Sequence, residues 1–219
     1  MSRSVISNQN IFEYAVSHST PPDGVLQELI DETRESTGGA AGMQIGADQG
    51  AFMAILSGSL RPRFAVEVGT FTGYSSICIA RGLAPEGKLL CCDVSEEWTD
   101  IAQRYWSKAN LSDKIDLVIA PGVETLKNLP SEEAIDLAFI DADKGGYTSY
   151  YEEIVPRLSP QGILLVDNTL WSGRVIPDSG SEDEDTLALR AFNDHVVNDP
   201  RVAAAQLTVG DGLTVITKV

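Results

Sequence analysis

The chain has 219 residues, with 16 Lys and Arg against 32 Asp and Glu, and a formal net charge of −16. This charge argues against binding of nucleic acid or of an anionic membrane, because both partners require a basic surface. It suits a protein that binds small molecules or metal cations. A chain of this length can bury a large core without disulfides.

The three cysteines are Cys78, Cys91 and Cys92. Their odd number and the adjacent pair inside an apolar run fit neither a disulfide framework nor a zinc site. We expect reduced, buried thiols and a cytoplasmic protein. The segment 1–10 is polar and lacks the apolar core of a signal peptide. No apolar run approaches the roughly 20 residues of a membrane span.

The first sixty residues are predicted to be helical. Apolar residues at helical spacing indicate helices over 10–17, from Pro21 onward, and over about 48–59. Glycines at 38, 39 and 42 separate the second and third helices. We interpret residues 1–62 as a helical N-terminal extension.

From Arg63 onward, short apolar runs alternate with amphipathic segments. Nearly continuous apolar strands between helices predict a parallel sheet covered on both faces. The expected strands are 64–68, 88–93, 115–119, 135–140 and 162–167, and the expected helices are about 73–83, 96–110, 122–129 and 146–157.

The C-terminal part is predicted to complete the sheet. A loop over 171–183 and a helix over about 184–198 precede strands at 202–209 and 213–219, which the turn Gly210-Asp211-Gly212 joins as a hairpin. We therefore predict one α/β domain over 1–219, with a Rossmann-like, seven-stranded, mostly parallel sheet in the core 63–219 and helices on both its faces.

Ligands of such a sheet bind beyond the carboxyl ends of its strands. The first strand ends in Glu67-Val-Gly-Thr-Phe-Thr-Gly73-Tyr-Ser75. Its glycines allow a sharp turn and a close backbone approach to a ligand. The Gly-x-x-x-Gly spacing differs from that of pyrophosphate-binding loops. This wider loop, with Glu67 two residues before its first glycine, favours a cationic ligand without phosphates, although an ordinary βα turn is the alternative.

The next two strand ends extend this candidate cofactor site. Asp93 ends the second strand, where a carboxylate can accept both hydroxyls of a ribose. Small residues at Ala120-Pro-Gly122 leave a slot for a flat ring such as adenine, or form a plain loop.

The fourth and fifth strands end in Asp141 and in Asp167-Asn168, on one rim of the sheet. Two carboxylates and an amide oxygen are hard ligands that suit Mg²⁺, with Mn²⁺ or Ca²⁺ as alternatives. Helix capping and turn formation are the competing roles, and we assign them to Asp143.

Lys144 follows this rim directly. A nearby divalent cation would make its ammonium easier to deprotonate, which makes Lys144 a candidate general base. The alternative is a surface lysine paired with a carboxylate. We interpret His18 and His195 as structural or solvent-exposed residues.

These residues resemble those of the cation-dependent, S-adenosylmethionine-dependent O-methyltransferases, the family that contains caffeoyl-CoA and bacterial catechol-type enzymes. The resemblance extends from about Met43 to Gly212. Its most specific segments are Glu67-Val-Gly-Thr-Phe-Thr-Gly-Tyr-Ser75, Phe139-Ile-Asp-Ala-Asp-Lys144, Asp167-Asn-Thr-Leu-Trp171 and Asp199-Pro-Arg201. It implies a class I methyltransferase fold and an enzyme.

The resemblance also implies roles for single residues. Gly122 stands at an adenine loop where the family usually shows Gly-x-Ala. Trp171 and Arg174 would border the acceptor pocket, and Lys144 would be the base, next to Asp141. The backbone near Ile45 would close over the cofactor, which Asp141 would touch as well. The implied cofactor residues are Glu67, Gly69, Thr70, Ser75 and Asp93, and the implied metal ligands are Asp141, Asp167 and Asn168.

The predicted function is transfer of a methyl group from S-adenosylmethionine to a hydroxyl of a catechol-type small molecule, assisted by a divalent cation. The acceptor is left open among free catechols, hydroxycinnamoyl-CoA esters, flavonoids and other metabolites. The family resemblance suggests a homodimer. Two rival functions are a nucleotide-linked oxidoreductase, which the glycine spacing disfavours, and a binding module that kept the fold without the activity.

Overall fold

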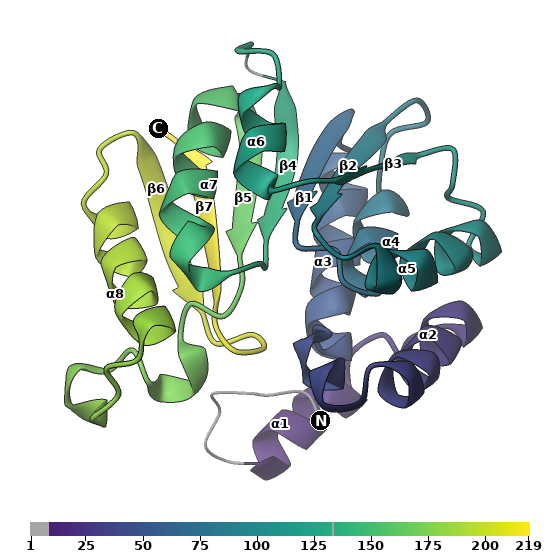
Figure 1. The fold of residues 1–219 in the computed structure, drawn as a ribbon, viewed down its shortest axis with the longest axis horizontal. Coiled ribbons are helices and arrows are strands. Elements are labelled where there is room, and N and C mark those ends of the chain that lie inside the picture. Colours follow the sequence, from purple (N-terminus) through teal and green to yellow (C-terminus); the bar gives the residue numbers. More distant parts are fainter. Residues whose placement is uncertain (1–8, 133) are drawn as a thin grey trace.

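The computed structural model describes residues 9–132 and 134–219. Residues 1–8, which belong to the polar N-terminal segment discussed above, lie outside the described residues. The described chain forms a seven-stranded sheet in the order β3-β2-β1-β4-β5-β7-β6, in which β7 runs opposite to the other six strands (Figure 1). The predicted α/β class and mostly parallel sheet are confirmed.

Four strands coincide with the predicted apolar runs: β1 (Phe64–Val68), β2 (Lys88–Asp93), β3 (Ile115–Ile119) and β4 (Ile135–Ile140). β6 (Val202–Leu207) and β7 (Leu213–Lys218) form the predicted hairpin, with β6 two residues shorter than expected.

The fifth strand, β5, differs from the prediction because it spans Leu158–Val166 and begins four residues early. Pro160 hid this start, since proline normally excludes a residue from an inner strand. The register with β4 shifts between the pair Ile135–Leu158 and the pair Leu137–Ile163. This irregularity accommodates the proline.

Three of the described helices begin at a side chain that caps them. Asp23, Ser95 and Asp183 accept hydrogen bonds from backbone N–H groups in the first turns of α2 (Gly24–Ser36), α5 (Glu96–Lys108) and α8 (Glu184–Val197). The remaining helices are α1 (Gln9–Ser17), α3 (Ala47–Leu60), α4 (Tyr74–Ala80), α6 (Gly122–Lys127) and α7 (Tyr147–Ile154), and short 3₁₀ segments include η1 (Gly38–Met43) and η5 (Pro177–Ser179).

The sheet separates two hydrophobic clusters. One contains side chains of α2 to α5, including Met53, Ile77 and Trp106. The other contains side chains of α6 to α8, including Leu126, Tyr151 and Phe192. Figure 1 shows α6, α7 and α8 in front of the sheet. Both faces are therefore covered, which explains the continuous apolar strands.

Strand order reverses between β1 and β4, and all five strands β1 to β5 point their carboxyl ends toward the same edge. This edge faces α1 in Figure 1. Cys78, Cys91 and Cys92 are free and buried, as predicted. None of the helices among the described residues is long and apolar enough to cross a bilayer.

Candidate active site

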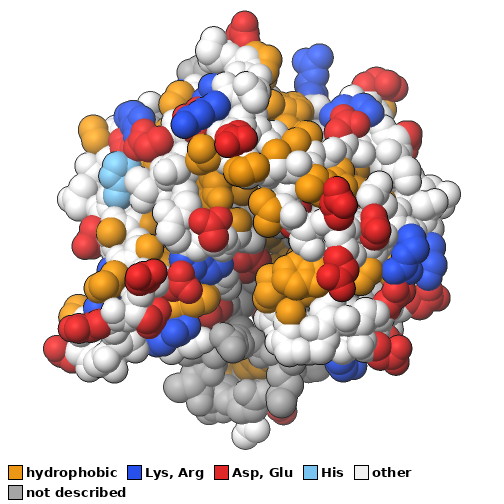
Figure 2. Space-filling view, in the orientation of Figure 1, with side chains coloured by type: hydrophobic (Ala, Val, Ile, Leu, Met, Phe, Trp, Pro, Cys, Tyr) orange, Lys and Arg blue, Asp and Glu red, His pale blue; other side chains and the backbone are white. Residues whose placement is uncertain are grey.

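A cavity of about 400 Å³ opens at the carboxyl ends of the strands, where the strand order reverses. Figure 2 shows a hollow near the centre of the view, at this edge. The cavity brings together every predicted site residue except Glu67 and Arg174. Those that line it are Ile45, Gly69, Thr70, Ser75, Asp93, Gly122, Asp141, Lys144, Asp167, Asn168 and Trp171.

The loop between β1 and α4 requires glycine at both of its predicted positions. Gly69 has a φ of 92°, and a Cβ there would overlap the carbonyl oxygen of Asp141. Gly73 has a φ of 86°, and a Cβ there would lie 2.7 Å from Cβ of Ala102. The loop thus lies directly against the end of β4, and a side chain at Gly69 would push the two apart.

The carboxylate of Asp93 holds this loop in place. Its Oδ2 accepts hydrogen bonds from the backbone N–H groups of Thr70 and Phe71, both at 2.8 Å. Its Oδ1 accepts from Val94 and Ser95 at 2.7 and 2.8 Å. A carboxylate offers about four acceptor positions. A ribose hydroxyl would therefore share an oxygen already used twice, and the ribose role of Asp93 stays a prediction.

Glu67 lies behind the cavity lining and is fully buried. Burial raises the pKa of its carboxyl to about 8, and the neighbouring Ser75, Cys91 and Thr70 side chains only partly offset this rise. The Cys91 thiol donates to its Oε2 at 3.3 Å, whereas Oε1 has no partner among the described residues. A cationic ligand close to Glu67 would favour its ionised form.

Asp141 and Asp167 extend the adjacent strands β4 and β5, and Asn168 follows. Burial and the charge of Asp141 raise the pKa of Asp167 well above its usual range. Its Oδ1 is buried without a hydrogen-bond partner among the described residues. Two close carboxylates, one with an orphaned oxygen, and a neighbouring amide form a donor set that fits a hard divalent cation.

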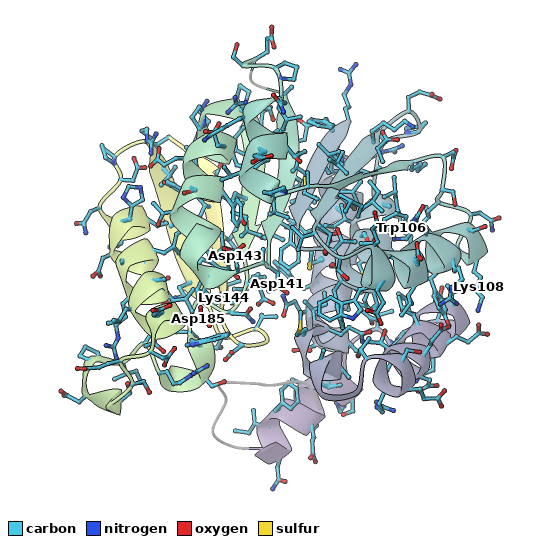
Figure 3. All side chains as sticks on the ribbon, in the orientation of Figure 1. Trp106, Lys108, Asp141, Asp143, Lys144 and Asp185 are labelled. Atoms are coloured by element: carbon cyan, nitrogen blue, oxygen red, sulfur yellow. The ribbon has the colours of Figure 1, made fainter. Side chains whose placement is uncertain are left out.

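Lys144 lies beside this donor set and is buried. Its Nζ donates to Asp141 Oδ1 at 3.3 Å, to the Ala142 carbonyl oxygen at 2.9 Å and to the Tyr147 hydroxyl at 2.7 Å. The Tyr147 hydroxyl donates in turn to the Asp167 carbonyl oxygen at 3.2 Å. Figure 3 shows Lys144 and Asp141 close together at the end of β4. The ammonium is thus aimed by protein groups and is not a free surface lysine.

Trp171 and Arg174 form an edge of the site after β5. The Arg174 guanidinium carbon lies 4.4 Å from the ring centre of Trp171, and Lys144 Nζ lies 5.4 Å from it. Arg174 also pairs with Asp183 at 3.6 Å. Arg174 itself stands outside the cavity lining, so it reaches the site through Trp171.

The loop Ala120-Pro-Gly122 has a local reason for its glycine. A Cβ at Gly122 would lie 2.7 Å from Val68 Cγ1 and 3.1 Å from the Tyr150 ring. The Tyr150 hydroxyl donates to Asp143 Oδ1 at 2.5 Å. Asp143 therefore precedes a turn, as predicted, but its carboxylate binds Tyr150 and caps no helix.

Several cavity residues were missed by the sequence interpretation. Gln49 is buried, and its Nε2 has no partner among the described residues. Trp98 packs edge-on against Phe71, with ring centres 4.9 Å apart. An aromatic residue in the first turn after Asp93 could have indicated Trp98. The other missed lining residues include Gln44, Tyr150 and Asp211.

The two histidines take no part in this cavity. His195 Nε2 lies 2.7 Å from Glu152 Oε1 on the surface of α8. Arg201 pairs with both Glu152 and Asp199, at 2.8 and 2.6 Å. The Arg201 guanidinium already neutralises the carboxylates of this cluster. We therefore interpret the cluster as a structural link between α7, α8 and the start of β6. His18 follows α1 and stacks on Tyr14.

Comparison with known proteins agrees with this architecture. A methyltransferase from Bacillus cereus, solved in complex with SAH, superposes with a TM-score of 0.86 and is 29% identical, over 98% of this chain and 100% of that chain. An SAH-bound methyltransferase from Podospora anserina gives a TM-score of 0.86 at 27% identity, over 96% and 94%. The fold is that of a class I methyltransferase.

The sequence comparison is more specific. Residues 16–219 match the family model described as O-methyltransferase. The Dictyostelium discoideum protein named Probable caffeoyl-CoA O-methyltransferase 2 is 37% identical over 97% of this chain and 93% of its own length. The chain belongs to the O-methyltransferase family. The predicted family is confirmed, while the roles assigned to single residues stay predictions.

Proposed function

We propose that this protein transfers a methyl group from S-adenosylmethionine to one hydroxyl of a catechol-type small molecule, assisted by a divalent cation. The observation that carries the proposal is that Lys144 donates to Asp141 in one cavity that Asp167 and the glycine loop at Gly69 also line. Two solved neighbours bear SAH, the demethylated product of that donor.

The charges of the site support a cationic donor. The buried Glu67 carboxyl lies behind the glycine loop, and Gly69 lets the backbone approach a ligand closely. S-adenosylmethionine carries a sulfonium and an ammonium group and no phosphate. The aromatic side chains of Trp98 and Phe71 suit its flat adenine ring on the β2 side of the cavity.

Asp141, Asp167 and Asn168 are the proposed ligands of the cation. When bound there, a divalent cation would act as a Lewis acid and lower the pKa of the acceptor hydroxyl. A vicinal pair of hydroxyls suits such a centre, because both oxygens can face it together. Mg²⁺ is our first choice, since the donor set is all oxygen.

The chain's own residues perform the remaining work. As a neutral amine, Lys144 takes the hydroxyl proton at Nζ and becomes the ammonium, held in position by Tyr147 and Asp141. Trp171 packs against the flat acceptor ring and excludes water. The acceptor oxygen then attacks the sulfonium methyl group, and the carbon–sulfur bond breaks as the oxygen–carbon bond forms. Confinement of both reactants in one cavity accelerates this step.

A methyl-transfer screen tests the proposal. The purified protein is incubated with S-adenosylmethionine and either caffeate, caffeoyl-CoA or catechol, with Mg²⁺ or with excess EDTA, and mass spectrometry identifies the methylated hydroxyl. The monophenol 4-coumarate serves as the control acceptor. We expect methylation of catechols only, and only with Mg²⁺. Full activity in EDTA would refute the cation, and binding of S-adenosylmethionine without transfer would favour a binding module.

We further propose a cytoplasmic homodimer. The N-terminal helical segment carries large exposed apolar side chains, namely Ile11, Tyr14, Met43 and Ile55. Exposed apolar groups of this kind often mark protein interfaces. The free buried cysteines fit a reducing compartment. Light scattering after size exclusion tests the dimer, and a monomer at micromolar concentration would contradict it.

A further inference from the structure

The segment that follows β5 is built from unusual backbone. Asn168, Trp171 and Ser172 have φ values of 58°, 45° and 54°, in the left-handed region that non-glycine residues seldom adopt. Such residues cost free energy and persist only where the surrounding structure holds them. Asn168 and Trp171 are also the residues that this segment contributes to the cavity.

The base of this segment is held from several elements. The Thr169 N–H donates to the Gly212 carbonyl oxygen at 3.0 Å. Asn193 Nδ2 and Gln206 Nε2 both donate to the Thr169 carbonyl oxygen, at 2.8 and 3.1 Å. The Thr214 hydroxyl donates to the Thr169 hydroxyl at 2.9 Å. Residue 169 is therefore anchored without help from any side chain of the 210–212 turn.

The tip of the segment, residues 170–172, is hydrogen-bonded to Asp211. Oδ1 of Asp211 accepts from the Ser172 N–H at 2.5 Å, and the Ser172 hydroxyl donates to both carboxylate oxygens at 3.2 and 3.3 Å. The Leu170 N–H donates to the Asp211 carbonyl oxygen at 3.0 Å. Asp211 is 5% exposed whereas Ser172 is exposed, so the carboxylate end of these bonds is shielded from water.

The glycines on either side of Asp211 bring it this close. Gly212 has a φ of 93°, and a Cβ there would lie 2.5 Å from the Leu170 nitrogen. A Cβ at Gly210 would overlap Oε1 of Gln49. The turn between β6 and β7 thus lies directly under the segment, and its backbone and carboxylate both face residues 170–172.

We infer that Asp211 is a positioning residue that holds Ser172 in its left-handed conformation and thereby sets Trp171 as the wall of the acceptor pocket. The inference rests on the proposed function for its catalytic consequence, because it takes Trp171 as part of that pocket. In this role Asp211 acts through Ser172 and Trp171 and contacts neither substrate. Loss of the carboxylate frees the tip while the base at Thr169 stays anchored.

The test compares Asp211→Ala and Asp211→Asn with the wild-type chain. Hydrogen exchange of the peptide 168–176 reads the tip without any substrate. We expect faster exchange there in Asp211→Ala and unchanged exchange in α7 and α8. With S-adenosylmethionine, Mg²⁺ and caffeate, KM for caffeate should rise about ten-fold, the effect of losing a hydrogen bond to a charged group. KM for S-adenosylmethionine should be unchanged. Asp211→Asn keeps one acceptor oxygen and should recover most of the loss.

A second substitution separates positioning from direct contact. Ser172→Gly removes the cost of the left-handed conformation, because glycine adopts positive φ freely. Asp211→Ala should therefore raise KM for caffeate far less in a Ser172→Gly background than in the wild-type background. Asp178→Ala, in the exposed η5 turn, is the matched control and should leave both KM values unchanged.

Two results would overturn the inference. Equal losses from Asp211→Ala in the two backgrounds would mean that Asp211 does not act through Ser172. Unchanged exchange over 168–176 would mean that the carboxylate does not hold the tip. If no catechol is methylated by the wild-type chain, the proposed function fails, and hydrogen exchange in the single and double variants still decides the role of Asp211.

Discussion

The donor side and the acceptor side of the cavity differ in how their backbone is supported. At the ends of β1 and β2, Asp93 accepts hydrogen bonds from four backbone N–H groups and so fixes the glycine loop. Phe71 in this loop has a φ of 50°, and the Glu67 carboxyl behind it keeps one oxygen without a partner among the described residues. At the ends of β4 and β5, Asp167 keeps an orphaned oxygen, and three non-glycine residues take left-handed backbone. The backbone of the donor side is thus fixed by hydrogen bonds to one carboxylate, whereas the acceptor side has more residues in left-handed backbone and two close carboxylates.

This difference indicates on which side of the cavity a bound ligand gains more free energy. A loop whose backbone N–H groups are already bound needs little reordering when a ligand arrives, so the donor side can bind one fixed cofactor with precise geometry. A side with two close carboxylates gains most from a bound cation. Substitutions should therefore affect the two sides differently, and the following experiments exploit that difference.

The largest effect is expected at Asp167. Asp167→Asn removes a charge from the proposed cation site, and methyl transfer with Mg²⁺ should fall below detection, as should transfer in Asp141→Ala. The same Asp167→Asn change removes a carboxylate whose burial is unfavourable when it is ionised. We therefore expect an unchanged or raised melting temperature at pH 8. Calorimetry of S-adenosylmethionine binding is the control, and retained turnover would contradict the cation assignment.

Lys144 gives the next effect. Lys144→Met keeps the length of the side chain but removes the proposed base, and kcat should fall by about 10²- to 10⁴-fold. Tyr147→Phe removes only the hydroxyl that accepts from Nζ at 2.7 Å, and kcat should fall less. Rates measured across pH with caffeate and Mg²⁺ separate the two. Equal losses in both variants would argue that Lys144 has a structural role.

Glu67→Gln should separate stability from binding on the donor side. The pKa of Glu67 in the folded protein, about 8, lies above its ordinary value of 4.5. The unfolded chain therefore ionises first, and the native state loses stability as pH rises from about 4.5 to 8. Glu67→Gln removes this penalty and should raise the melting temperature of the ligand-free protein at pH 8 but hardly at pH 5. Affinity for S-adenosylmethionine should fall. A stabilisation independent of pH would refute the assigned cause.

The smallest effect is expected at the mouth of the acceptor side. The segment 171–185 contains one cation, Arg174, and five acids. Figure 2 shows acidic side chains gathered at the lower left of the view, where Figure 1 places η5 and the start of α8. Arg174→Ala should raise KM for caffeoyl-CoA a few-fold more than KM for caffeate, because the thioester carries phosphates. Equal changes would show that Arg174 acts only by stacking on Trp171.

Sequence reasoning recovered the regular parts of the molecule and the residues at strand ends. Apolar runs located β1 to β4 because buried parallel strands have few other compositions. Strand ends then placed Asp141 and Asp167 on one rim. The start of β5 was missed, since Pro160 normally excludes a strand and only the register shift against β4 admits it.

Other features depend on contacts between distant residues and leave no local signal. The bond from Ser172 to Asp211 joins positions 39 residues apart, and the four amides on Asp93 include two from another loop. The left-handed backbone of Trp171 was equally hidden, because tryptophan has no preference for that conformation. Sequence patterns thus located the candidate site residues, whereas the hydrogen bonds that hold these residues in position are seen only in the three-dimensional structure.

The contact between Gly69 and the Asp141 carbonyl oxygen has an evolutionary consequence. It joins the donor loop to the cation rim through backbone alone, with no room for even a methyl group at position 69. Single side-chain substitutions therefore cannot adjust the distance between the donor loop and the cation rim in small steps. The acceptor wall at Trp171 and the segment after it consist of side chains that can be exchanged one at a time. New acceptor preferences in this chain would therefore arise by changes in that wall, while this backbone contact keeps the distance between donor loop and cation rim.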